Sequence, residues 1–157
     1  MKQIGVGILG FGTVGAGVAE GLLKHRTVLA ERLDVDIVLK KIADLDITTD
    51  RGVDVPKDAL TTDAFAVISD PGVQIVVETI GGTGIARTLV LKALESKKCV
   101  VTANKKLLAE YGREIFDTAA ANNVDIYFGA SVGGGIPIIR VLREGLAGND
   151  IESIDGI

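Results

Sequence analysis

Short apolar runs alternate along the chain with longer segments in which apolar residues recur at helical spacing. The runs are rich in β-branched residues and predict buried strands over 4–9, 35–43, 73–79, 98–102 and 124–128. The segments with helical spacing predict helices over 13–33, 63–69, 84–96, 104–122 and 136–146. Alternation of this kind is typical of βαβ units, so we expect an α/β fold with a doubly wound, mostly parallel sheet.

Side-chain positions within the helical segments add detail. Ile85, Leu89 and Leu94 share one face of their segment and are expected to point into the core. Gly17 and Gly21 form a pair of small residues on the first helical segment, for which close helix packing is the expected use.

Composition narrows the class of protein. The chain has 157 residues, one cysteine, one histidine and a net charge of −4. This composition excludes collagen, a disordered chain and a disulfide scaffold. The single cysteine favours a reducing compartment, so we expect a cytoplasmic location. No apolar run reaches the roughly 18 residues of a membrane helix, and no basic cluster indicates nucleic acid as a partner. One cysteine and one histidine leave no zinc site and no nucleophilic triad.

A glycine-rich turn directly follows the first predicted strand. Residues 10–15 are Gly-Phe-Gly-Thr-Val-Gly, which is the GxGxxG spacing in the strand–turn–helix context of a dinucleotide-binding loop. Gly10 would permit the tight turn, Gly12 would let the backbone approach a pyrophosphate, and Gly15 would let helix and strand pack closely. The alternative is a tight turn without a ligand.

The end of the second predicted strand supplies a candidate group for the ribose. Asp44 follows the run over 35–43, where a carboxylate would accept hydrogen bonds from ribose hydroxyls and repel a 2′-phosphate. The alternative is a solvated aspartate in a turn. Lys40, Lys41 and Arg51 could instead receive a 2′-phosphate. Both NAD and NADP therefore stay open as the cofactor, and Asp44 favours NAD.

Three further segments go beyond a generic nucleotide-binding fold. They are VVETIGG at 76–82, VTANKKLLA at 101–109 and ASVGGGIPII at 130–139. In this order, after GFGTVG, they resemble the N-terminal half of homoserine dehydrogenase, over nearly the whole chain. The resemblance implies a Rossmann-type NAD(P)-binding domain of an oxidoreductase. Such an enzyme interconverts L-homoserine and L-aspartate 4-semialdehyde with NAD(P)(H), on the route to threonine, methionine and isoleucine.

The resemblance also implies roles for particular residues. The pyrophosphate would lie against the backbone of Phe11, Gly12, Thr13 and Val14. The nicotinamide side would lie along two further strand ends, at Ile80, Gly81, Thr102, Ala103, Asn104 and Lys105. A monovalent cation such as sodium would be bound by the backbone carbonyls of Gly129, Val132, Gly134 and Ile136. The chain departs from the family at Gly129, where relatives usually have glutamate.

Hydride transfer requires the protein mainly to orient the cofactor and to stabilise charge that develops on a carbonyl oxygen. Lys105 is the candidate catalytic residue, because it follows the carboxyl end of a buried strand, where open α/β sheets place ligands. A lysine is also a poor match for the helix dipole just after a cap such as Asn104. Lys106 is expected to be solvated. Glu78, near the same sheet edge, is expected either to contact a ribose or to anchor a loop.

We divide the chain into an NAD(P)-binding domain over 1–130 and the start of a substrate and dimerisation domain over 131–157, in which 151–157 would begin a strand. The family's substrate-binding acids and a catalytic lysine belong to that second domain. We therefore expect an inactive fragment of a homodimeric enzyme with a small-molecule substrate. Two other functions stay open: a non-catalytic NAD(H)-binding regulatory module, and a related dehydrogenase acting on another aldehyde or amino acid.

Overall fold

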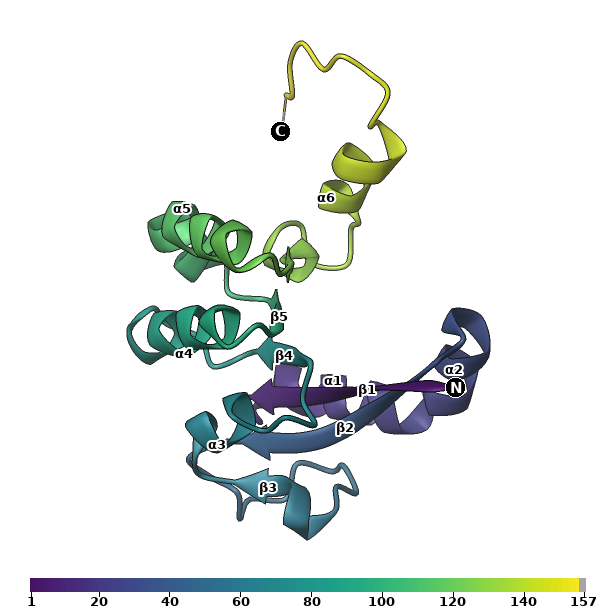
Figure 1. The fold of residues 1–157 in the computed structure, drawn as a ribbon, viewed down its shortest axis with the longest axis vertical. Coiled ribbons are helices and arrows are strands. Elements are labelled where there is room, and N and C mark those ends of the chain that lie inside the picture. Colours follow the sequence, from purple (N-terminus) through teal and green to yellow (C-terminus); the bar gives the residue numbers. More distant parts are fainter. Residues whose placement is uncertain (156–157) are drawn as a thin grey trace.

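A computed structural model describes residues 1–155, and its centre is a six-stranded sheet. The strands are β1 (Lys2–Leu9), β2 (Val35–Ala43), β3 (Leu60–Thr61), β4 (Ile75–Glu78), β5 (Cys99–Thr102) and β6 (Ile126–Tyr127). Every neighbouring pair runs parallel, in the spatial order β3-β2-β1-β4-β5-β6 (Figure 1). This is the order of two mononucleotide-binding halves that meet between β1 and β4. The predicted doubly wound α/β fold is therefore confirmed.

Helices connect the strands and cover the sheet. They are α1 (Thr13–Lys24), α2 (Arg26–Leu33), α3 (Ala64–Ile68), α4 (Gly84–Glu95), α5 (Lys105–Asn122) and α6 (Ile138–Arg140). Shorter turns complete the chain: the 3₁₀ turns η1 (Lys57–Ala59) and η2 (Gly129–Ser131), and the π-helical turn η3 (Val141–Gly145). Figure 1 shows α4 and α5 side by side along one flank of the molecule. No helix in the described part of the chain is long and apolar enough to cross a bilayer.

Each face of the sheet has its own apolar core. In β1, Ile8 belongs to the cluster that includes residues of α1, whereas Leu9 belongs to the cluster that includes residues of α3, α4 and α5. Ile42 and Ala43 of β2 divide between the two clusters in the same way. Successive side chains of a strand point to opposite faces, so both faces are covered. Nearly continuous apolar strands require this arrangement.

The region predicted as one helix over 13–33 is two helices. His25, with φ of −105° and ψ of 12°, ends α1 and precedes α2. α2 places no residue in the described core, although its Leu29 and Ala30 are half-buried. The Arg26 guanidinium also donates two hydrogen bonds of 2.7 Å to the Asp36 carboxylate on β2. These bonds, with one from Gln3, hold the pKa of Asp36 down at about 2.

Two expectations about side-chain positions within the helices are wrong in part. Leu89 and Leu94 are buried as predicted, but Ile85 is 54% exposed because it lies in the first turn of α4, above the sheet edge rather than over the sheet. Gly17 and Gly21 pack against nothing: a Cβ built on either glycine meets no atom within 4 Å. Close helix packing therefore does not explain this pair.

The chain after β6 contributes little to the sheet. The helix predicted over 136–146 is confirmed for residues 138–145, where the short α6 continues directly into η3, and this segment extends away from the sheet in Figure 1. Residues 151–155 have no regular structure, so the strand expected over 151–157 is wrong for them. None of them pairs with β6, which is the last strand of the described sheet and pairs with β5 alone. Residues 156 and 157 lie outside the described part.

Candidate functional site

The turns that follow β1, β2 and β4 meet at one edge of the sheet. The Gly10 amide donates to the Ala43 carbonyl at 2.8 Å, and the Thr79 amide donates to the Leu9 carbonyl at 2.8 Å. A cleft of about 360 Å³ opens at this edge. It is lined by Gly10, Gly12, Ala43, Asp44, Leu45, Thr62, Ala64, Thr79, Ile80, Ile85 and Leu89. Its position at the reversal of strand order is where open α/β sheets bind ligands.

The physical reason for having glycine differs between the three glycine positions of the turn. Gly10 has φ of +98°, which L side chains rarely adopt. A Cβ on Gly15 would lie 2.0 Å from the Gly10 carbonyl oxygen, so only glycine lets α1 approach the turn. A Cβ on Gly12 would meet nothing within 4 Å, and its φ of −69° is ordinary. The chain itself therefore does not require glycine at Gly12, whereas a ligand close to the backbone would.

Asp44 lies beside the glycine turn rather than in open solvent. Its Oδ2 accepts a hydrogen bond of 2.5 Å from the Phe11 amide, and its Oδ1 accepts one of 2.9 Å from the Asp46 amide. The Phe11 amide was expected to face a pyrophosphate; in this structure it donates to the carboxylate. The amide end of α1 begins just beyond, at Thr13 and Val14, which are both exposed. The carboxylate thus couples the end of β2 to the turn after β1.

The three basic candidates for a 2′-phosphate lie in different places. Lys40 Nζ donates to Gln3 Oε1 at 2.9 Å, and Lys41 Nζ pairs with Asp70, which precedes β4, at 3.0 Å. The bond from Lys41 lowers the pKa of Asp70 from its ordinary value. Both lysines are therefore engaged away from the carboxyl edge. Arg51 alone lies beside α1.

Arg51 lines a groove with residues of the first turns of α1, Thr13, Ala16, Gly17 and Glu20. Its Nη2 pairs with Asp46 Oδ2 at 3.1 Å, and its Nε is buried with no hydrogen-bond partner in residues 1–155. Hydrogen bonds from Thr49 and Thr48 hold the pKa of Asp46 well below its ordinary value. The Asp46 carboxylate therefore stays charged and partly neutralises Arg51.

Glu78 is buried at the end of β4, with no exposed surface. Its Oε1 accepts from the amides of Ile80, at 2.9 Å, and Gly81, at 3.4 Å, and its Oε2 accepts from the Thr102 hydroxyl at 2.6 Å. Of the two expectations for Glu78, the structure supports the anchor for a loop. The fully buried side chain is not accessible to a ribose.

The nicotinamide-side candidates of β5 and α5 differ in what they offer a ligand. Thr102 is buried and its hydroxyl is engaged by Glu78, so its side chain faces inward. Asn104 caps α5 as predicted, because its Oδ1 accepts from the Leu107 amide at 3.0 Å. Lys105 is exposed, and Lys106 pairs with Glu110 at 3.8 Å. The amide of Ala103 donates to the Glu78 carbonyl at 3.4 Å. Among the four nicotinamide-side candidates of β5 and α5, residues 102–105, Lys105 alone carries an exposed charge.

The candidate cation ligands lie on an exposed loop after β6. Gly129 O accepts from the Val132 amide at 3.2 Å, and Ile136 O accepts from the Ile138 amide at 2.8 Å. Gly134 has a positive φ of 60°, which helps to turn the loop. Within residues 1–155, no group of three or more histidine, cysteine, aspartate or glutamate side chains could hold a metal. A cation here would therefore rest on carbonyl oxygens.

Sequence reasoning missed the apolar lining of the cleft. Leu45 is 93% exposed and Ile85 54% exposed, yet both line the cleft with Ala64. Ligand clefts combine such apolar walls with a few polar groups, here the Asp44 carboxylate. The sequence did contain a signal for this lining, because Leu45 is an isolated apolar residue between Asp44 and Asp46, directly after a strand.

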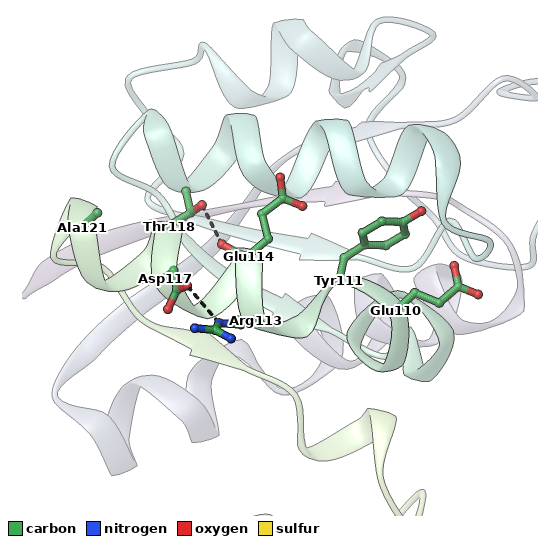
Figure 2. Close-up of a pocket in the computed structure, with 7 residues that line it drawn as sticks. All are labelled: Glu110, Tyr111, Arg113, Glu114, Asp117, Thr118 and Ala121. Carbon is green, nitrogen blue, oxygen red and sulfur yellow. Dashed lines mark hydrogen bonds and ion pairs between the residues drawn. The ribbon is translucent and has the colours of Figure 1, made fainter.

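A second hollow follows the outer face of α5 and has a different character. Figure 2 shows its lining residues, which all belong to this one helix. Arg113 pairs with Asp117 at 3.9 Å (Figure 2). Arg87 of α4 donates two hydrogen bonds to Glu114, which lower the pKa of Glu114 from its ordinary value. Because these charges are already paired and no other loop converges there, the hollow is a surface feature of the helix.

The chain is similar to known homoserine dehydrogenases. A family model described as "Homoserine dehydrogenase, NAD binding domain" matches residues 10–129. The homoserine dehydrogenase of Bacillus subtilis (strain 168) is 47% identical over 157 residues, which are 100% of this chain and 36% of that protein. The chain thus spans little more than a third of that relative's length.

Solved structures agree with this similarity. A homoserine dehydrogenase from Thiobacillus denitrificans gives a TM-score of 0.88 at 45% identity, over 95% of this chain and 34% of the other. A hyperthermophilic archaeal homoserine dehydrogenase in complex with NADPH gives a TM-score of 0.72 at 26% identity, over 93% of this chain and 50% of the other.

The glycine geometry makes a prediction about stability. Gly15→Ala should lower the free energy of unfolding by at least ~2 kcal/mol, because the new Cβ overlaps the Gly10 carbonyl. Gly17→Ala, on the same helix but facing open space, should raise it by about 1 kcal/mol. Urea unfolding followed by circular dichroism measures both. Equal effects of the two substitutions would contradict this assignment.

Proposed function

Because the chain belongs to the homoserine dehydrogenase family, as its NAD-binding domain, we propose that it holds the nicotinamide dinucleotide for a longer enzyme that interconverts L-homoserine and L-aspartate 4-semialdehyde. The observation that carries the proposal is the open space at Gly12, at the amide end of α1 and at the cleft edge. A pyrophosphate there meets backbone N–H groups and the positive end of the helix dipole. Thr13 and Val14 supply neighbouring backbone N–H groups, whereas the amide of Phe11 is engaged by Asp44.

NAD is the cofactor that the cleft favours. Asp44 lines the cleft at the end of β2, and its carboxylate accepts hydrogen bonds from ribose hydroxyls but repels a 2′-phosphate. NADP is the second candidate, favoured by the Nε of Arg51, which has no partner in the described part of the chain, and by the NADPH bound to the archaeal relative. Asp46 already neutralises part of the Arg51 charge, which weakens that alternative.

The nicotinamide half lies, in this proposal, along Ile80, Gly81 and the segment from Thr102 to Lys105. Lys105 acts on the carbonyl oxygen that gains charge during hydride transfer, as donor of a charge-assisted hydrogen bond. It is exposed at the carboxyl end of β5, in a position to meet a substrate held by another domain.

A monovalent cation such as sodium is proposed at the carbonyls of Gly129, Val132, Gly134 and Ile136. Carbonyl oxygens are suitable ligands for hard cations, and each has two lone pairs, so those of Gly129 and Ile136 can accept a hydrogen bond and still bind an ion. Such an ion would stiffen the loop after β6. The carbonyls supply only coordination, and no chemical step depends on the ion.

Residues 1–130 form the NAD(P)-binding domain in this proposal, and residues 131–157 lead into a substrate and dimerisation domain. The end of the family match at residue 129 and the departure of α6 from the sheet support this boundary (Figure 1). We propose a homodimer for the complete enzyme. The lone Cys99 is consistent with a cytoplasmic location.

Calorimetric titration of this chain with NADH and with NADPH tests the proposed binding. NADH should bind, and Gly12→Val should weaken binding by on the order of 100-fold, because the side chain fills the space proposed for the pyrophosphate. Gly17→Ala is the matched control and should bind like the unchanged chain. If Gly12→Val binds NADH normally, the turn is not the pyrophosphate site.

Asp44→Ser tests the cofactor preference. The substitution should weaken NADH by about tenfold relative to NADPH, because it removes a charged acceptor for the ribose hydroxyls. Asp54→Ser removes the same charge from an exposed position outside the cleft and should leave the ratio unchanged. An unchanged NADH to NADPH ratio in Asp44→Ser would reject the ribose role.

Lys105 and Lys106 form a matched pair for the catalytic proposal. In the longer enzyme, Lys105→Met should lower kcat for homoserine oxidation by roughly 10²–10⁴-fold, the usual range for a lost acid group. The KM for the nucleotide should change little. Lys106→Met should have no effect, because Lys106 pairs with Glu110 on its own helix. Full activity of Lys105→Met would remove Lys105 from the catalytic machinery, and absent homoserine oxidation in the unchanged enzyme would favour another substrate or a regulatory module.

A further inference from the structure

Within residues 1–155, the Glu78 carboxylate is the one fully buried ionisable side chain among the large core residues, and the functions described so far do not use it. Its partners are neutral donors: the Ile80 and Gly81 amides and the Thr102 hydroxyl. A buried carboxylate costs free energy that an apolar residue would not. What the carboxylate adds is a pair of acceptors, one oxygen for the loop after β4 and the other for the end of β5.

Hydrogen bonds extend from Glu78 to a third loop. The Thr102 hydroxyl accepts from the Asn104 amide at 3.0 Å, and the Thr102 carbonyl accepts from the Ser131 hydroxyl at 2.9 Å. Asn104 Nδ2 returns to the loop after β4 by donating to the Gly82 carbonyl at 2.6 Å. The loops after β4, β5 and β6 are therefore joined by one network, and its members Glu78, Thr102, Asn104 and Ser131 are all buried.

The network also decides which polar groups the edge can offer to a ligand. The amides of Ile80 and Gly81 donate inward to Glu78, so they are not free for a phosphate. The carbonyls of the same two residues accept no hydrogen bond within residues 1–155. Both residues are exposed. The edge therefore has two exposed residues whose carbonyls have no internal partner, and one of them, Ile80, lines the cleft, whereas the start of α1 has exposed backbone donors.

We propose that Glu78 is a positioning residue for the nicotinamide half of the cofactor, acting through Thr102 and Asn104 to hold the Ile80–Gly81 carbonyls as a rigid acceptor surface. Hydrogen-bond donors fit such a surface: the hydroxyls of the nicotinamide ribose and the amide group of the carboxamide. The pyrophosphate, which only accepts, is directed to the other side of the cleft. This inference rests on the proposed placement of the nicotinamide along this edge.

Glu78→Gln tests the proposal with two probes, NADH and ADP, because ADP lacks the nicotinamide half. The amide replaces an acceptor oxygen by a donor, so at least one of the three donors loses its partner. NADH should bind about tenfold more weakly, because the loop after β4 is no longer held in place and has to be ordered when the nicotinamide half binds. The dissociation constant of ADP should stay within about twofold, since Gly12 and Asp44 are unchanged.

Thr102 and Thr118 supply a matched pair for the same measurement. Thr102→Val removes the hydroxyl at nearly constant shape and should weaken NADH like Glu78→Gln, whereas Thr118→Val removes a hydroxyl that donates within α5, away from the cleft, and should bind NADH normally. The fluorescence of bound NADH, which reports on the nicotinamide surroundings, should change in Thr102→Val and not in Thr118→Val. If Glu78→Gln does not fold, Asn104→Asp replaces it, because aspartate keeps the cap on α5 and loses the donor to Gly82.

The outcomes separate this inference from the proposed function. NADH and ADP weakened in parallel would make the network a general structural support and overturn the positioning role. NADH binding unchanged in Glu78→Gln and Thr102→Val would overturn it as well, while leaving cofactor binding intact. An unchanged chain that binds neither NADH nor ADP would overturn the proposed function and this inference together.

Discussion

The close approach of α1 to the turn after β1 is the contact on which the site depends. There is no room for a side chain at Gly15, because its Cβ would reach the Gly10 carbonyl. The same carbonyl accepts a hydrogen bond of 2.9 Å from the Thr79 hydroxyl, which follows β4. One backbone position thus fixes the start of α1 against both halves of the sheet. The helix dipole and the cleft at the strand reversal are aligned by that contact.

The two acidic residues at the sheet edge, Asp44 and Glu78, have different surroundings and different roles. Asp44 joins the end of β2 to the turn at Phe11, and Glu78 joins the end of β4 to the end of β5. Both are acidic residues at strand ends, but Asp44 lines the cleft and Glu78 has no exposed surface. The difference lets one carboxylate meet a ligand and confines the other to holding the loops that would meet it.

Local patterns predicted five of the six strands, the Asn104 cap and the glycine turn because these features depend on neighbouring residues. β3 (Leu60–Thr61) was not predicted, because two residues are too few to give a periodic pattern. The break at His25 was not predicted, because the helical spacing continues through α2 although none of the α2 residues belongs to the described core. The exposed Ile85 was missed for a related reason. Periodicity gives the face of a helix, but it does not tell whether the sheet still lies beneath its first turn. The apolar lining at Leu45 was missed because an isolated exposed leucine is common on protein surfaces.

By itself, the sequence determined the alternation of strands and helices, the glycine turn after β1 and the family segments, since these are properties of residue order. Only the tertiary structure decided which groups face the cleft. It placed Lys40 and Lys41 on internal partners, left Arg51 beside α1, and closed Glu78 inside a hydrogen-bond network. Such choices depend on which distant segments the sheet brings together, and spacing along one strand or helix does not contain that information.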